Sequence, residues 1–291
     1  MSMMNVLITG SSKGFGKLIA KTLIKDGHTV IASMRGAADK NKAAADELSK
    51  NGAKIVEMDV TSDSSVQAGV EKALKLAGEI DVVVNNAGVG VLGLQETFTI
   101  EDWKKCFEIN LFGVQRVNRA VLPGMRNKKS GLLIHISSIL GRMVIPFYGP
   151  YNATKFALEA MADNYRIELS SYGIESVLIE PGGYGTSFMD SLIRPTDTER
   201  VKEYAAMAQA PEASLAAFSK IFEGDKAPNP QWVADAVSDL IKKPRGQRPF
   251  RTVVDRIGMG AAIEPYNQSI EEIQKNVFTA FGMAESLKLK I

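Results

Sequence analysis

Short apolar segments alternate with segments of helical periodicity along most of this chain of 291 residues, and this alternation constrains its fold more than any other feature. The apolar segments are continuous rather than alternating with period two, which is typical of strands buried on both faces of a parallel sheet. They span 6–9, 30–32, 54–58, 82–84, 132–136, 176–179 and 252–254. This order predicts an α/β fold with a doubly wound, mainly parallel sheet of seven strands and helices on both faces.

The alternation breaks between 187 and 230, where helical signals occur without a strand. We expect this segment to be an insertion that covers an edge of the sheet, and we call it the lid. After the last strand, residues 257–291 are expected to form a C-terminal extension with a helix over 270–281. The sequence contains no internal repeat and no low-complexity linker, so one domain is expected over 1–291.

Composition excludes several classes of protein and site. The net charge of +2 and the absence of a dense Lys/Arg cluster argue against nucleic-acid binding, and no apolar run is long enough to span a membrane. One cysteine, Cys106, and two histidines exclude an intrachain disulfide and argue against a zinc site of Cys and His ligands. His135 lies in an apolar strand segment, where a structural, hydrogen-bonded role is favoured over catalysis. A reducing, cytoplasmic location fits this composition best.

A glycine-rich turn follows the first predicted strand and leads into the first predicted helix. It reads Thr-Gly-Ser-Ser-Lys-Gly-Phe-Gly over 9–16. Glycines allow a tight turn and a close approach of the backbone to a pyrophosphate, and the helix N-terminus behind them offers unpaired N–H groups. In this context the turn favours dinucleotide binding.

Further segments occur in a fixed order after this turn, and together they carry a family resemblance. They are Asn85-Asn86-Ala87-Gly88, Asn110, Ser137-Ser138, Tyr151 to Lys155, and Pro181-Gly182 with Thr186. With the G-x-x-x-G-x-G spacing of the turn, this order resembles the short-chain dehydrogenase/reductase family from about residue 4 to 190. The resemblance implies a single-domain Rossmann fold and hydride transfer to or from a nicotinamide cofactor. It also implies that the protein assembles as a homodimer or homotetramer.

The end of the second predicted strand favours NADP(H) over NAD(H). An acidic residue at this position binds the ribose 2′-OH of NAD, whereas an Arg nearby accommodates the 2′-phosphate of NADP. The strand here ends in Arg35, with no acid, and Lys13 in the glycine-rich turn adds a second positive charge. NADP-preferring members of the family resemble this chain at both positions.

The resemblance also implies the remaining cofactor contacts. The Asp59 side chain and the Val60 backbone would contact the adenine, and 86–88 would pass close to its ribose. The full set of expected cofactor-binding residues is Gly10, Ser12, Lys13, Gly14, Phe15, Gly16, Arg35, Asp59, Val60, Asn86, Ala87, Gly88, Tyr151, Lys155, Pro181, Gly182 and Thr186.

Tyr151 and Lys155 are spaced to share one face of a helix. An ammonium about 4 Å from a phenol is worth about 4 kcal/mol at an effective dielectric near 20, or roughly 3 pKa units. We therefore expect Lys155 to lower the pKa of Tyr151, which would act as general acid in carbonyl reduction and general base in alcohol oxidation. By resemblance, Ser138 would hydrogen-bond the substrate oxygen, and Asn110 would hold a water on a proton path to Lys155.

The lid and the segment before Tyr151 are rich in apolar residues, which favours a bulky hydrophobic ketone or aldehyde as substrate. Packing of the lid onto the sheet explains the same residues equally well. They are Met143, Ile145, Phe147, Tyr148, Phe188, Met189, Leu192, Ile193, Met207, Leu215, Phe218, Ile221 and Phe222.

The leading hypothesis is an NADPH-dependent carbonyl reductase that acts on a small molecule without metal, nucleic-acid or membrane partners. The alternatives are an alcohol or hydroxysteroid-type dehydrogenase working oxidatively, a non-catalytic NADPH-sensing protein, and a sugar-nucleotide epimerase, which the glycine spacing fits less well.

Overall fold

The seven strands form one parallel sheet in the order β3-β2-β1-β4-β5-β6-β7, which confirms the predicted fold class. The computed structural model describes residues 3–224 and 227–290, so residues 225–226 of the lid and the termini of the predicted domain lie outside the described residues. The strands are β1 (Asn5–Ile8), β2 (Thr29–Met34), β3 (Lys54–Glu57), β4 (Val82–Asn85), β5 (Gly131–Ile136), β6 (Ile174–Pro181) and β7 (Arg251–Val254). Each strand contains one of the predicted apolar segments, either in full or with one residue missing. The strands are apolar because both faces of the sheet are covered.

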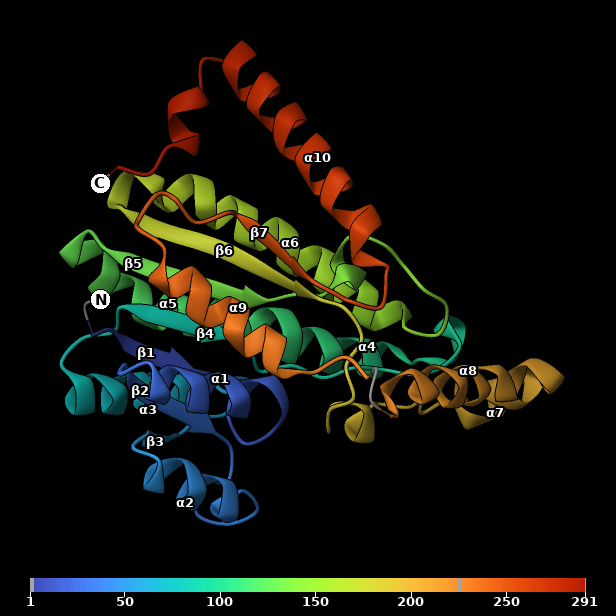
Figure 1. Cartoon of the computed structure of the whole chain (residues 1–291). Helices are drawn as coiled ribbons and strands as arrows, with labels where there is room; N and C mark the ends of the chain where they lie inside the picture. Colours follow the sequence, from blue (N-terminus) through green and yellow to red (C-terminus); the bar gives the residue numbers. More distant parts are fainter. Residues whose placement is uncertain (1–2, 225–226, 291) are drawn as a thin grey trace.

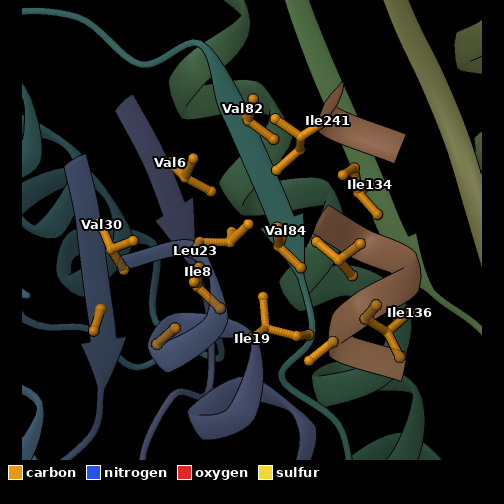
Figure 2. Close-up of a cluster of buried hydrophobic side chains, with 14 of the residues drawn as sticks. Val6, Ile8, Ile19, Leu23, Val30, Val82, Val84, Ile134, Ile136 and Ile241 are labelled. Carbon is orange, nitrogen blue, oxygen red and sulfur yellow. The ribbon is translucent and has the colours of Figure 1, made fainter. Parts of the chain in front are cut away.

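Helices pack on both faces of the sheet, and neighbouring residues of a strand therefore belong to different cores (Figure 1). Val6 and Ile8 of β1 pack with α1 (Gly14–Lys25) and α9 (Gln231–Lys242), as Figure 2 shows, whereas Leu7 packs with α3 (Asp63–Ala77) and α5 (Gly113–Lys128). Burying a side chain of this size contributes about 1.5–3 kcal/mol. The other helices of these layers are α2 (Lys42–Lys50) and α6 (Gly149–Leu169).

The lid contains short helices and lies beyond the carboxyl ends of the strands, together with α4 (Ile100–Phe107) (Figure 1). Its main helices are α7 (Thr198–Glu203) and α8 (Ala210–Ser219). One isolated bridge joins Val91 to Ile193 and fixes the start of the lid to the segment after β4.

The C-terminal helix α10 (Gly260–Ala280) begins ten residues before the predicted start at 270, so that prediction was too short. Pro265 lies inside this helix and removes one helical hydrogen bond, so the sequence around it resembles the end of a helix. Burial of Ile263 and Asn267 against the body of the protein keeps the helix continuous there. Among the described residues, no helix combines the length and the hydropathy that crossing a membrane requires.

Candidate active site

A cavity of about 510 Å³ lies at the carboxyl ends of the strands and extends under the lid. Nearly all of the site residues expected from the sequence line it, and Gly16 and Asn110 are the exceptions. Those lining it are Gly10, Ser12, Lys13, Gly14, Phe15, Arg35, Asp59, Val60, Asn86, Ala87, Gly88, Ser138, Tyr151, Lys155, Pro181, Gly182 and Thr186. The fold therefore brings together segments from across the first two thirds of the sequence.

The glycine-rich turn leaves no room for side chains at two of its positions. Gly10 has φ +68°, and a Cβ there would lie 2.9 Å from Ala87 Cα. A Cβ on Gly16 would lie 2.4 Å from Gly10 O. Helix α1 starts directly behind the turn with no side-chain cap from Lys13 and no acid in its first turn, so its N–H groups suit an anion. This cradle fits the pyrophosphate of a dinucleotide.

Asn86 fixes the turn to the end of β4. Its Nδ2 donates to Thr9 O at 2.9 Å and to Gly10 O at 3.1 Å, while Thr9 Oγ1 accepts from the backbone N–H groups of Asn86 and Ala87 at 3.0 Å. The Asn86 side chain thus shapes the turn, and the expected approach of 86–88 to the adenine ribose stays a prediction.

Arg35 and Asp59 face each other at the other end of the cavity, with 3.7 Å between Nη1 and Oδ2. Partial burial raises the pKa of Asp59, but hydrogen bonds from Thr61 and the charge of Arg35 outweigh it and lower the pKa below its usual value. Asp59 caps the turn at Thr61, whereas Ser62 caps α3. Its expected contact with adenine stays a prediction.

Lys13 contacts the lid. Its Nζ donates to Ser187 O at 3.3 Å and to Ser191 Oγ at 3.2 Å. The expected second positive charge beside Arg35 stays a prediction, and the contacts of Lys13 with the lid were not foreseen. The sequence could not show this, because the lid is far away along the chain.

Tyr151 and Lys155 lie on one face of α6, both largely buried. Lys155 Nζ donates to Ile136 O at 2.8 Å and lies 5.6 Å from the centre of the Tyr151 ring. Burial lowers the pKa of Lys155 to about 8.

The prediction that the pKa of Tyr151 is lowered was wrong. Burial raises this pKa well above its usual value, and a hydrogen bond with Ser138 opposes the change only in part. The sequence argument assumed a charge about 4 Å away and left out the cost of removing the phenolate from water. The protonated phenol that results is the form a general acid needs.

Ser138 lies at the end of β5, within the cavity. Its Oγ accepts from Leu140 N at 3.1 Å and makes a long contact of 3.5 Å with Pro181 O. Ser137 also lines the cavity, and its hydroxyl is buried without a partner among the described residues. The hydrogen bond to Tyr151 favours Ser138 as the serine that acts with it.

Asn110 lies behind the cavity wall, in a π-helical turn over Glu108–Phe112. Its side chain is hydrogen-bonded to both backbone groups of Val89, at 2.8 and 2.9 Å, and to Thr154 Oγ1 at 3.0 Å. π-Helical turns are frequent at functional sites. Here the turn ties the segment after β4 to α6, and the water-holding role of Asn110 stays a prediction.

His135 is a structural residue, as the sequence indicated. Its Nδ1 lies 3.3 Å from Asn85 Nδ2 and its Nε2 lies 3.2 Å from Ser176 Oγ. Burial lowers its pKa to about 3, so the ring is neutral. Cys106 is also buried, which raises its pKa to about 11 and makes it unreactive.

The apolar residues of the lid divide between the cavity and the core. Phe188, Met189, Phe218 and Phe222 line the cavity, and the Phe188 ring meets Tyr151 edge-on at 5.8 Å. Leu192, Ile193 and Leu215 pack with residues around the site instead, and Met207 and Ile221 are exposed. Part of this segment therefore lines the cavity and part packs around it, and the substrate class stays a prediction.

Several residues that line the cavity were not predicted from the sequence, among them Lys40, Asn41 and Met259. Lys40 and Asn41 lie at the end with Arg35, and Met259, just before α10, lies in the same cavity. Lys40 and Asn41 follow the strand-end position of the motif, and Met259 lies far beyond the last recognised segment. Only the folded chain brings them to the cavity.

The comparisons with known proteins agree with this geometry. The sequence pattern described as short chain dehydrogenase matches residues 4–197. The chain is 34% identical over 251 residues to the 3-ketodihydrosphingosine reductase of Bacteroides thetaiotaomicron, covering 86% of this chain and 87% of that protein. It is also 34% identical over 253 residues to human retinol dehydrogenase 8, covering 82% and 78%.

A solved short-chain dehydrogenase from Streptomyces avermitilis has a TM-score of 0.75 to this chain at 25% identity, over 97% of this chain and 98% of that one. The chain thus belongs to the short-chain dehydrogenase family and is an oxidoreductase. Members of this family use a nicotinamide cofactor.

Proposed function

We propose that this protein uses NADPH to reduce a hydrophobic ketone or aldehyde to an alcohol. One observation carries the proposal. Ser138, Tyr151 and Lys155 line the same cavity as the glycine-rich turn, which can hold a dinucleotide, and apolar residues of the lid. The bound nicotinamide supplies the hydride. The residues of the chain bind the substrate, move the proton and exclude water.

The buried phenol of Tyr151 gives its proton to the substrate oxygen, and Ser138 donates a hydrogen bond to that oxygen as its charge develops. The Lys155 ammonium, held by Ile136 O, favours the tyrosinate that remains. Phe188 covers Tyr151 from the lid side and keeps bulk water away from the exchange.

The walls near Tyr151 favour an uncharged, hydrophobic substrate. Five residues that line the cavity pack in one cluster with Tyr151: Leu140, Ile145, Tyr148, Phe188 and Met259. Among the described residues, the cations that line the cavity are Lys13, Arg35, Lys40 and Lys155. Lys13 is already hydrogen-bonded to Ser187 and Ser191 of the lid, so the apolar walls suit an uncharged substrate better than a carboxylate or a phosphate. The two relatives are named for the reduction of a ketodihydrosphingosine and the oxidation of retinol, which supports a hydrophobic substrate.

Titration with NADPH and NADH, followed by nicotinamide fluorescence, tests the cofactor proposal. We expect the protein to bind NADPH at least tenfold more tightly, because Arg35 can make charge-assisted contacts worth about 1.5–3 kcal/mol with the 2′-phosphate. Arg35→Ala should remove most of that preference while leaving NADH binding nearly unchanged. A preference for NADH would overturn the proposal in favour of oxidation with NAD.

The rate of reduction should fall as the pH rises. The pKa of Lys155 is about 8, so its ammonium loses its proton above that pH and no longer favours the tyrosinate. A profile of kcat/KM with saturating NADPH should be flat near pH 6–7 and decline above about pH 8. Lys155→Arg keeps its charge, so the residual activity of that variant should lack this decline. A wild-type profile that stays flat up to pH 10 would argue against this role.

A further inference from the structure

Helix α10 contacts the segment that follows Ser138 through one buried side chain, Asn267. The Oδ1 of Asn267 accepts from Arg142 Nε at 2.8 Å, and its Nδ2 donates to Glu180 Oε2 at 2.6 Å. Asn267 is 6% exposed and Glu180 is fully buried. The Arg142 guanidinium also lies over the ring of the neighbouring Tyr266, 4.6 Å from its centre. Two successive residues of α10 therefore hold Arg142 in place.

The two partners of this buried amide each lie next to residues that line the active-site cavity. Arg142 follows Ser138 after the single 3₁₀ turn Ile139–Gly141. Glu180 lies at the end of β6, directly before the cavity-lining residues 181–182, where we expect cofactor contacts. The amide thus joins the backbone that carries the catalytic serine to the backbone that faces the expected cofactor.

The chemistry of a carboxamide suits this place. Asn267 lies between a guanidinium, which can only donate, and an oxygen of the Glu180 carboxyl group, which accepts. A carboxamide provides an acceptor for the first and a donor for the second. Arg142 Nε and Glu180 Oε1 are 3.9 Å apart, which is too far for a direct hydrogen bond. The amide therefore supplies the hydrogen bonds that link the two segments.

The start of α10 contacts the same edge of the cavity. Met259 lines the cavity, and Asp255 Oδ2 accepts from Gly260 N at 2.8 Å at the beginning of the helix. Asp255 packs so closely on Gly182 that a Cβ built on this glycine would lie 1.9 Å from Asp255 Oδ1. The chain beyond residue 197, where the family match ends, therefore forms part of the site.

We propose that Asn267 is a positioning residue, which holds the Ser138 segment in place against the cofactor edge of the cavity, so that the C-terminal helix completes the active site. The inference rests on the reduction proposed above as the reaction of this site. Asn267 does not line the cavity, so it acts through Arg142 and Glu180. A reacting group that is displaced by about 1 Å can lose about 10²-fold in rate, so a remote brace of this kind affects turnover.

Amide hydrogen exchange tests the brace without relying on turnover. The N–H groups of 141–143 are hydrogen-bonded within the turn after Ser138, and in Asn267→Leu they should exchange about fivefold faster or more. Peptides from β1 and α1 should exchange as they do in the unaltered protein. Asn276→Leu is the matched control, because Asn276 is exposed on the same helix, and it should change neither region. Thermal unfolding curves show at which temperature all variants are folded.

The NADPH-dependent reduction of decanal and of 2-decanone provides the second measurement. Asn267→Leu should lower kcat about tenfold to a hundredfold and change the Kd for NADPH less than about threefold. Arg142→Met breaks the same link from the other side and should lower kcat similarly. Because both changes break one link, their effects on kcat should not add in the double variant.

The possible results are distinct. Unchanged exchange at 141–143 in Asn267→Leu would overturn the inference, and so would equally faster exchange in β1 and α1, since Asn267 would then only stabilise the fold. An unchanged kcat despite faster exchange, or losses that add in the double variant, would overturn it too. If the unaltered protein bound NADPH but reduced neither carbonyl compound, the proposed function would be wrong, and the exchange rates would decide by themselves whether Asn267 holds the turn.

Discussion

Replacing Tyr151 with phenylalanine is expected to lower kcat by about 10²–10⁴-fold and to leave NADPH binding within about twofold. The change removes the hydroxyl that gives the proton but keeps the ring, which packs against Phe188 at 5.8 Å. Steady-state rates with a hydrophobic ketone measure the first effect, and fluorescence titration with NADPH measures the second. The two together distinguish loss of chemistry from loss of the site.

Tyr172→Phe provides the matched control, because Tyr172 is 45% exposed and follows the far end of α6. It should leave both rate and binding unchanged. If Tyr151→Phe kept full turnover, the proton would have to come from another group and the mechanism proposed here would be wrong. If the unaltered protein bound NADPH but turned over no carbonyl or alcohol, the non-catalytic NADPH-sensing alternative would be favoured.

The strands were predicted from the sequence with little error, and the reason is physical. A strand covered on both faces must be apolar throughout, so segments such as 132–136 stand out from the helices around them. The C-terminal helix was predicted less well. Its start depends on the packing of Ile263 and Asn267 against distant elements, which local periodicity does not contain.

The positions of the site residues followed from motif order, but their interactions did not. Tyr151 and Lys155 share a helix face as their spacing required. The pKa of Tyr151 depends on how deeply the whole fold buries it, and the contacts of Lys13 depend on a lid far away in sequence. Lys40 was overlooked because its place in the cavity follows from the turn at Gly36.

A buried cluster of charged residues is a further feature that the sequence did not reveal. The Arg251 side chain is only 4% exposed, and its Nε lies 2.9 Å from Glu159 Oε2 and 3.6 Å from Glu180 Oε1. Glu159 is one turn after Lys155 on α6, and Asn267 of α10 donates to Glu180 at 2.6 Å. The cluster thus joins β7, α6, β6 and α10 one helical turn away from Lys155.

Replacing Arg251 with methionine should lower the free energy of unfolding by about 3–5 kcal/mol, because it leaves the buried carboxylate of Glu159 without its counter-charge. Urea denaturation at pH 7 measures this loss. Arg256→Met is the matched control: Arg256 is exposed and lies 4.5 Å over the ring of Trp232, so its removal should cost about 0.5–1 kcal/mol.

The dependence of this loss on pH identifies its cause. Burial, with the charge of Glu159, raises the pKa of Glu180 to about 8 in the folded protein, above its value of about 4.3 in an unfolded chain. The folded state therefore binds more protons between these values, and this group makes stability fall as the pH rises from about 4.3 to 8. The charge of Arg251 opposes this rise in pKa, so without Arg251 the Glu180 carboxyl holds its proton more tightly, and the deficit of the variant should shrink toward pH 5 and grow toward pH 8. A deficit that is the same at both pH values would mean that Arg251 stabilises the fold by packing rather than by its charge.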